Sequence, residues 1–113
     1  MGVYNGFKLT KEEAMKCKTI DAGQLKLLIE NKKAIIIDVR EDFEYRNGHV
    51  PGAKNIPLSQ LEERYAEITD GTYLICQSGA RSARACQYLS TKGIDTINIS
   101  GGTSAWDGQL DFD

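Results

Sequence analysis

Residues 72–99 have the sequence TYLICQSGARSARACQYLSTKGIDTINI, in which two apolar runs flank a helical pattern. The runs Thr72–Cys76 and Thr96–Ile99 are short and rich in β-branched or aromatic residues, which is typical of buried strands. Between them, apolar residues recur at helical spacing, which predicts a helix from about Ala80 to Lys92 that Gly93 ends. A strand, a crossover helix and a strand in this order predict a right-handed parallel βαβ unit.

The rest of the chain adds elements of the same kind. Residues 34–39 form a continuous apolar run, which predicts a strand buried on both faces. A brief strand at 19–21 leads to Asp21, a suitable N-cap for a helix that ends near Asn31. Further helical segments are expected at 43–46, at 58–66 and around Trp106, whereas 107–113 shows no clear pattern. The sequence therefore predicts an α/β domain with a small parallel sheet flanked by helices on both faces.

Length and composition fit one domain and exclude several classes of protein. We expect residues 1–18 to be an N-terminal extension and 19–113 to be the single domain of this 113-residue chain. The formal net charge is −2 and no basic stripe is present, so a nucleic-acid partner is not expected. No apolar run reaches the roughly 20 residues that cross a bilayer, and polar residues fill the first fifteen positions. These features predict a cytoplasmic protein without a membrane partner.

The chain has three cysteines and one histidine. An odd number of cysteines without a secretory signal argues against a disulfide framework. Without a CxxC pair, no closed metal site is expected. Cys86 falls on the apolar face of the predicted helix, so burial explains it best. Cys17 has no assigned role, although its thiol could resolve an oxidised Cys76.

Cys76 is the candidate nucleophile. It ends a predicted strand and precedes a helix, where ligands of open α/β sheets bind and where free N–H groups favour an anion. A thiolate at this position should have a lowered pKa, and the thiolate is the reactive form. Gly79 lets the backbone curl around one point, and Arg81 adds a permanent positive charge. A cysteine in this place is more often a packing residue, but packing requires neither the glycine nor the arginine.

Four motifs, in order, resemble the rhodanese homology domain. The Cys-x-x-Gly-x-Arg active loop of that family is matched by Cys76, Gly79 and Arg81. A second signature is matched by Tyr45 and by the run from His49 to Ala53 with Ile56. The segment 37–40, Ile-Asp-Val-Arg, is similar to the family's strand ending in Asp-x-Arg, and Gly101-Gly102 with Ala105-Trp106 is similar to its C-terminal element. The resemblance covers about residues 20–108 and implies a five-stranded parallel sheet of the rhodanese type.

The resemblance implies a sulfurtransferase in which Cys76 accepts a sulfane sulfur as a persulfide. The implied partners are a small anionic donor such as thiosulfate and a thiol or protein acceptor, with no cofactor and no metal. Arg81 would orient the donor, while Asp38, Arg40 and His49 would support the site. The implied substrate-binding loop consists of Gln77, Ser78, Gly79, Ala80, Arg81 and Ser82.

Two alternatives stay open beside this interpretation. A phosphatase or arsenate reductase of similar fold has a loop one residue longer, Cys-x-x-x-x-x-Arg, whereas Arg81 stands five positions after Cys76. A persulfide carrier or a regulatory binding module would use the fold with little turnover. Because only Arg81 in the loop is charged, we expect weak affinity for thiosulfate.

Overall fold

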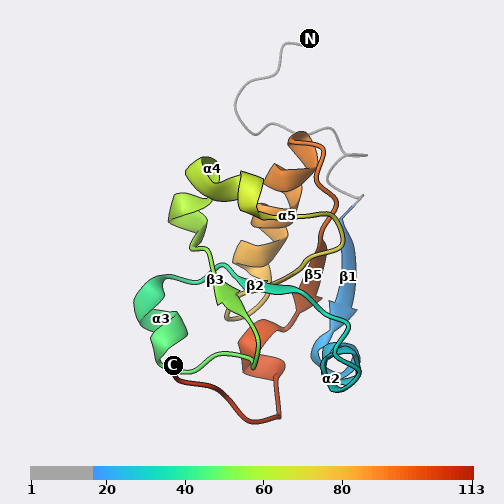
Figure 1. Ribbon diagram of the computed structural model, residues 1–113, viewed down its shortest axis with the longest axis vertical. Coiled ribbons are helices and arrows are strands. Elements are labelled where there is room, and N and C mark those ends of the chain that lie inside the picture. The colour runs from blue at the N-terminus through green and yellow to red at the C-terminus, as the bar shows by residue number, and fades with distance from the viewer. Residues whose placement is uncertain (1–16) are drawn as a thin grey trace.

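The computed structural model describes residues 17–113, which form a five-stranded sheet with helices on both faces (Figure 1). The strands lie in the order β1-β5-β4-β2-β3, and every pair is parallel. Their bounds are Lys18–Asp21 for β1, Ile36–Asp38 for β2, Lys54–Asn55 for β3, Tyr73–Ile75 for β4 and Ile97–Ser100 for β5. The predicted α/β class and parallel sheet are confirmed.

The helices form two layers, one on each side of this sheet. Apolar contacts place α5 (Ala80–Thr91) and α4 (Leu61–Arg64) on one face and α2 (Ala22–Glu30) on the other, where Trp106 also packs directly after the 3₁₀ turn η3 (Gly102–Ala105). The short helix α3 (Asp42–Arg46) follows β2. Each fully buried Leu or Ile of these two clusters contributes about 1.5–3 kcal/mol. The layers therefore fix the ends of the central strands, where the candidate site lies.

The sequence patterns at helix ends predict several boundaries well. The Asp21 Oδ1 atom accepts a hydrogen bond from the Gln24 N–H at 2.8 Å, and the Gln24 side chain returns one to the Asp21 N–H at 2.9 Å. This capping box starts α2 where it was expected. Helix α5 ends at Thr91, one residue before the predicted end, and Gly93 follows with a φ of +78°. At these positions the local sequence is sufficient to predict where the helix begins or ends.

Three local predictions differ from the structure. The helix expected over 58–66 is divided into a 3₁₀ turn η1 (Leu58–Gln60), α4 and a second 3₁₀ turn η2 (Tyr65–Glu67). Trp106 follows η3 rather than lying within it. The C-terminal segment without a clear pattern returns to α3 (Figure 1), where Asp111 forms an antiparallel bridge with His49. The partner in this bridge is distant in sequence, so no local pattern indicates it.

The expectation of no disulfide is wrong, because Cys17 and Cys86 form one. Cys17 directly precedes β1, and Cys86 lies on α5, with 6.1 Å between their Cα atoms. An odd cysteine count is compatible with one bond and one free thiol. The predicted burial of Cys86 is correct but incomplete, and Cys17 is bonded to Cys86 rather than free to resolve Cys76.

Two expectations concern the ends and surroundings of the chain. Within residues 17–113, no helix has the length and apolar character needed to cross a membrane. The expected N-terminal extension lies, up to residue 16, outside the described residues. The division into an extension and a domain therefore stays a prediction.

Candidate active site

The candidate site lies at the end of β4, between β5 and β2 in the middle of the sheet. Cys76 follows the last residue of β4, and α5 begins four residues later. The Cys76 Sγ atom accepts hydrogen bonds from the Gly79 N–H at 3.0 Å and the Ser82 N–H at 3.3 Å. The backbone thus curls around the sulfur, and its N–H groups converge on one atom.

Glycine makes this curl possible at two positions. Gly79 has a φ of +105°, a conformation that L side chains rarely adopt. A Cβ at Gly102 would lie only 2.3 Å from the Cys76 carbonyl oxygen, so only glycine allows η3 to approach the loop so closely. With η3 in place, Thr103 donates to that carbonyl from its N–H at 2.8 Å and from its hydroxyl at 3.1 Å. The segment that follows β5 therefore holds the loop in place through these two hydrogen bonds.

The Ser82 side chain adds a third group beside the sulfur. Its Oγ atom lies 3.3 Å from the Cys76 Sγ and also contacts the side-chain oxygen of Asn98 on β5. A hydroxyl has one proton, and the two ends of an amide are distinguished only by their hydrogen bonds. The Ser82 hydroxyl can therefore donate to only one acceptor at a time, and the Cys76 Sγ, the Asn98 Oδ1 and the Gly79 carbonyl at 3.2 Å all lie within its reach. Asn98 is a site residue that the sequence analysis did not identify.

These contacts lower the pKa of the Cys76 thiol. Burial alone raises this pKa, since the side chain is only 1% exposed. The hydroxyl and N–H of Ser82, followed by the N–H groups of Gly79 and Ser78, favour the thiolate and outweigh burial. The site therefore favours the thiolate form of one enclosed sulfur atom.

Arg81 is not a free cation. Its Nη1 and Nη2 atoms donate to the two carboxylate oxygens of Glu44 on α3, at 2.7 and 2.9 Å. This hydrogen-bonded pair holds the pKa of Glu44 at about 2 and raises the pKa of Arg81. Glu44 therefore neutralises the charge that we expected to orient an anionic donor. No local pattern indicates Glu44, which is 37 positions away in sequence.

Asp38 and Arg40 form a buried ion pair beside the loop. The Arg40 Nη2 atom donates to the Asp38 carboxylate at 2.8 Å and to the Gly48 carbonyl at 2.8 Å. Its Nη1 atom donates to the side-chain oxygen of Gln77 at 3.3 Å. Gln77 in turn donates to the Ser104 hydroxyl at 2.9 Å. The pair thus contacts the loop from the neighbouring strand, and the supporting role of both residues stays a prediction.

His49 is buried and occupied on both ring nitrogens. Its Nδ1 atom lies 2.9 Å from the Tyr45 carbonyl oxygen, and its Nε2 atom lies 3.0 Å from an Asp113 carboxylate oxygen. The imidazole stacks on the Tyr45 ring at a centroid distance of 3.6 Å. These contacts join α3 to the C-terminal segment. The supporting role of His49 at the site stays a prediction.

The remaining predicted loop residues lie around the mouth of the site. Gln77 and Ser78 are exposed between β4 and α5, and Ala80 is the exposed first residue of α5. Their side chains are therefore open to solvent, while their backbone forms the loop around the Cys76 Sγ, and their role in binding a substrate stays a prediction.

Fold and site together define a parallel α/β domain that presents a hydrogen-bonded cysteine at the end of a central strand. The sequence profile of the rhodanese-like domain matches residues 21–109. The chain belongs to the rhodanese-like domain family. Solved structures have the same fold. A rhodanese-like domain protein from Staphylococcus aureus superposes on this chain with a TM-score of 0.78 at 36% sequence identity. The superposition covers 85% of this chain and 98% of the Staphylococcus aureus chain.

Curated relatives of this chain include proteins named for sulfur transfer. The Bacillus subtilis protein YqhL is 50% identical over 82 residues, which are 70% of this chain and 65% of YqhL, and its name states no function. YtwF of B. subtilis, provisionally named a sulfurtransferase, is 39% identical over 84% of this chain and 95% of its own length. YrkF of B. subtilis, provisionally named a sulfur carrier protein, is 33% identical over 94% of this chain and 60% of its own length. The relatives thus connect this domain with the handling of sulfur.

Proposed function

We propose that this protein is a sulfurtransferase that carries a sulfane sulfur on Cys76. The observation that supports this most directly is the set of hydrogen bonds to the Cys76 Sγ, from the Gly79 N–H at 3.0 Å and from the N–H and hydroxyl of Ser82 at 3.3 Å. The same donors that favour a thiolate also suit a persulfide, whose terminal sulfur is an anion. The surrounding Gln77–Ser82 loop would bind the incoming donor.

The first half-reaction loads the sulfur. The Cys76 thiolate attacks the outer sulfur of thiosulfate, the S–S bond of thiosulfate breaks, and its electron pair leaves with sulfite. The product is Cys76–S–S⁻. In the second half-reaction an acceptor thiolate or cyanide attacks the outer sulfur, and the electron pair of the broken bond returns to Cys76 Sγ. Atoms and charge balance in both steps, and the kinetics are ping-pong.

Intact-mass spectrometry tests this proposal. After incubation with thiosulfate, the protein should gain one sulfur atom, and cyanide should remove it with release of thiocyanate. The Cys76→Ser variant should gain nothing. A sulfur adduct of equal size on Cys76→Ser would overturn the assignment.

One observation favours a carrier that is slow with free thiosulfate. Glu44 neutralises Arg81 through two short hydrogen bonds, so the loop offers no unpaired side-chain charge to a dianion. A protein or persulfide donor, which needs less electrostatic attraction, would then load Cys76 faster than thiosulfate. A Michaelis constant for thiosulfate in the low micromolar range would contradict this second candidate.

A further inference from the structure

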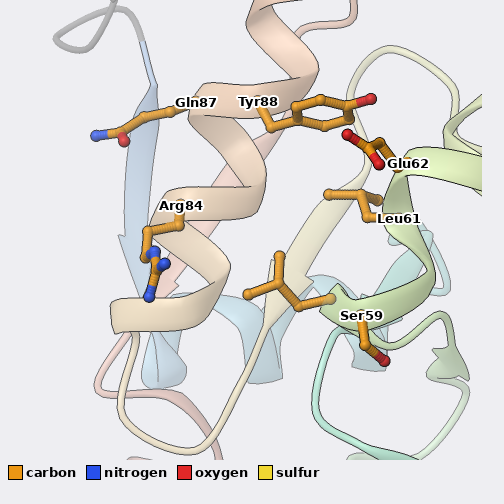
Figure 2. Close-up of a pocket in the computed structure, with 7 residues that line it drawn as sticks. Ser59, Leu61, Glu62, Arg84, Gln87 and Tyr88 are labelled. Carbon is orange, nitrogen blue, oxygen red and sulfur yellow. The ribbon is translucent and has the colours of Figure 1, made fainter. Parts of the chain in front are cut away.

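Two clusters of charged side chains outside the active-site loop differ in how closely their charged atoms approach. A pocket of about 360 Å³ lies between α5 and the η1–α4 segment, and Figure 2 shows Arg84 pointing away from Glu62 across it. In the C-terminal segment, by contrast, the side chains of His49, Asp111 and Asp113 come together, and one nitrogen or oxygen atom of each lies within 4.8 Å of the other two. The second cluster therefore has the convergence that a bound ion requires.

The backbone places these three side chains on one side of the C-terminal segment. His49 and Asp111 form an antiparallel bridge, with hydrogen bonds of 2.9 and 2.8 Å between their backbone N–H and carbonyl groups. Residues that lie directly opposite in such a pair have their side chains on the same face. Residues two positions apart in extended backbone share a face as well, so Asp113 joins Asp111 beside the imidazole. Sequence spacing does not indicate this cluster, because only the bridge brings the aspartates to His49.

The hydrogen bonds of the His49 ring indicate a cation at this point. The Nδ1 atom lies 2.9 Å from the Tyr45 carbonyl oxygen, which can only accept, so Nδ1 carries a proton. In the neutral imidazole, the Nε2 lone pair then points at a carboxylate oxygen of Asp113 that lies 3.0 Å away and also accepts. The His49 side chain is 2% exposed. A proton or a metal ion must therefore lie between these two acceptors.

The dimensions and charges of the cluster fit a metal ion. Zinc bonds of about 2.0–2.2 Å to nitrogen and oxygen place two neighbouring ligand atoms about 3–3.5 Å apart, and the 3.0 Å between Nε2 and Oδ1 lies in this range. A ring N–H donated to a backbone carbonyl is the usual second contact of a metal-binding histidine. Two carboxylates also neutralise a divalent ion. Within residues 17–113, no lysine or arginine forms an ion pair with Asp111 or Asp113.

We propose that His49, Asp111 and Asp113 bind a divalent transition-metal ion of the Zn²⁺ class. The His49 Nε2 atom and one carboxylate oxygen of each aspartate are the three protein ligands, and water completes the coordination, as in other open zinc sites. The imidazole ligand selects against Mg²⁺ and Ca²⁺, which prefer oxygen. The ion joins the C-terminal segment to the residues that follow α3, and it stabilises the folded chain because the unfolded chain does not hold these ligands together. The site is independent of the chemistry proposed for Cys76.

Calorimetric titration with Zn²⁺ tests this site on the full chain without a histidine tag. The Cys76→Ser variant is used throughout, because a cysteine thiolate is itself a zinc ligand, and no reducing agent is added, so the Cys17–Cys86 disulfide stays closed. We expect one Zn²⁺ per chain, a melting temperature that rises with Zn²⁺ concentration, and no rise with Mg²⁺ at the same concentration. The chain has one histidine, so the ring ¹⁵N signals report on this site alone. The Nε2 signal should shift when Zn²⁺ binds, while Nδ1 keeps its proton.

Substitutions of the two aspartates assign the ligands. Asp111→Asn and Asp113→Asn each change an exposed side chain, so the variants should fold without Zn²⁺, which circular dichroism checks. Each should weaken Zn²⁺ binding by more than about tenfold, since even the loss of an outer contact of a metal ligand costs about this much. Asp107→Asn is the matched control, because Asp107 is exposed in the same segment but lies outside the cluster, and it should bind Zn²⁺ as tightly as the parent.

Three outcomes would overturn the metal site. They are a melting temperature that Zn²⁺ does not change, an Nε2 signal that does not shift, and Zn²⁺ binding that survives both Asp111→Asn and Asp113→Asn. A proton would then lie between His49 and Asp113, and these residues would form an ordinary ion pair. None of these outcomes bears on the proposed function, which the sulfur adduct on Cys76 tests separately.

Discussion

Cys76 and Cys86 are almost equally buried, at 1% and 2% exposure, and pack in the same apolar cluster, yet their sulfur atoms differ in chemistry. Cys86 is bonded to Cys17, whereas Cys76 is a free thiol that accepts hydrogen bonds from the loop and the start of α5. Burial therefore does not determine which cysteine is reactive. The donors around the sulfur make the difference, because they favour its charged form.

The largest expected effect is the loss of sulfur transfer in Cys76→Ser. A serine hydroxyl is not ionised near neutral pH and cannot form a persulfide, so thiocyanate release should fall to background. Removing the other two cysteines as Cys17→Ala with Cys86→Ala should leave most of the activity, because neither contacts the loop donors. An assay of thiocyanate formation from thiosulfate and cyanide compares the three proteins. Full loss of thiocyanate formation in the double alanine variant would contradict the assignment of the activity to Cys76 alone.

The second effect concerns stability, for which we expect the Cys17–Cys86 disulfide to matter more than Cys76. The disulfide joins residues 69 positions apart, so cleavage of this bond should lower the free energy of unfolding. The expected loss is about 2–4 kcal/mol. Urea denaturation with and without a reducing agent measures it. The Cys17→Ala, Cys86→Ala variant serves as the control, since a reducing agent should not change its midpoint. An unchanged midpoint in the wild type would mean that the bond contributes nothing.

The third effect sharpens the account of the thiolate. Ser82→Ala removes the hydroxyl beside the Cys76 Sγ and should raise the pKa of the thiol toward its ordinary value. Alkylation by iodoacetamide at neutral pH should slow about tenfold, which corresponds to one lost hydrogen bond to a charged group. The rate should recover as pH rises through the new pKa, because deprotonation then no longer needs the hydroxyl. Ser90→Ala, elsewhere on α5, is the control. A pH profile identical to that of the wild type would show that the backbone alone sets this pKa.

The smallest expected effect comes from Glu44→Gln. This change removes the carboxylate that neutralises Arg81, so the guanidinium can interact with thiosulfate. We expect the Michaelis constant for thiosulfate to fall about threefold, since partly exposed charges interact weakly. The pKa of Glu44 is lowered from 4.5 to about 2, so the ion pair in the wild type is fully formed above pH 4.5. Its contribution to stability is lost only as the pH falls from 4.5 toward 2. A constant that rises in Glu44→Gln would mean that the pair positions Arg81 instead of neutralising it.

Local patterns predict much of the fold. The apolar runs predict the central strands, Asp21 as an N-cap predicts the start of α2, and Gly93 predicts the end of α5 within one residue. They also place Cys76 between a strand and a helix, which is sufficient to expect converging N–H groups. These features depend on residues that are neighbours in sequence, so hydrophobic period and turn chemistry describe them.

The partners of the site residues could not be predicted in this way. The Arg81–Glu44 pair and the Ser82–Asn98 contact join segments that only the folded sheet brings together. The Cys17–Cys86 bond depends on β1 lying beside β5, at the end of the sheet opposite β3. A single sequence states which residues are present but not which distant ones meet. For this reason the sequence does not indicate that Arg81 pairs with Glu44, and the role of Arg81 in binding a donor stays a prediction.

The close approach of Gly102 to the Cys76 carbonyl has a consequence for the timing of synthesis. A growing chain that has been translated only as far as Ser100 already contains the nucleophile and all of α5. It lacks Gly102, which lies against the Cys76 carbonyl, and Thr103, which donates a hydrogen bond to that carbonyl. The ribosome must therefore add the segment after β5 before the cysteine is held in its final setting. An incomplete polypeptide would leave this thiol without the anchored loop that surrounds it in the finished protein.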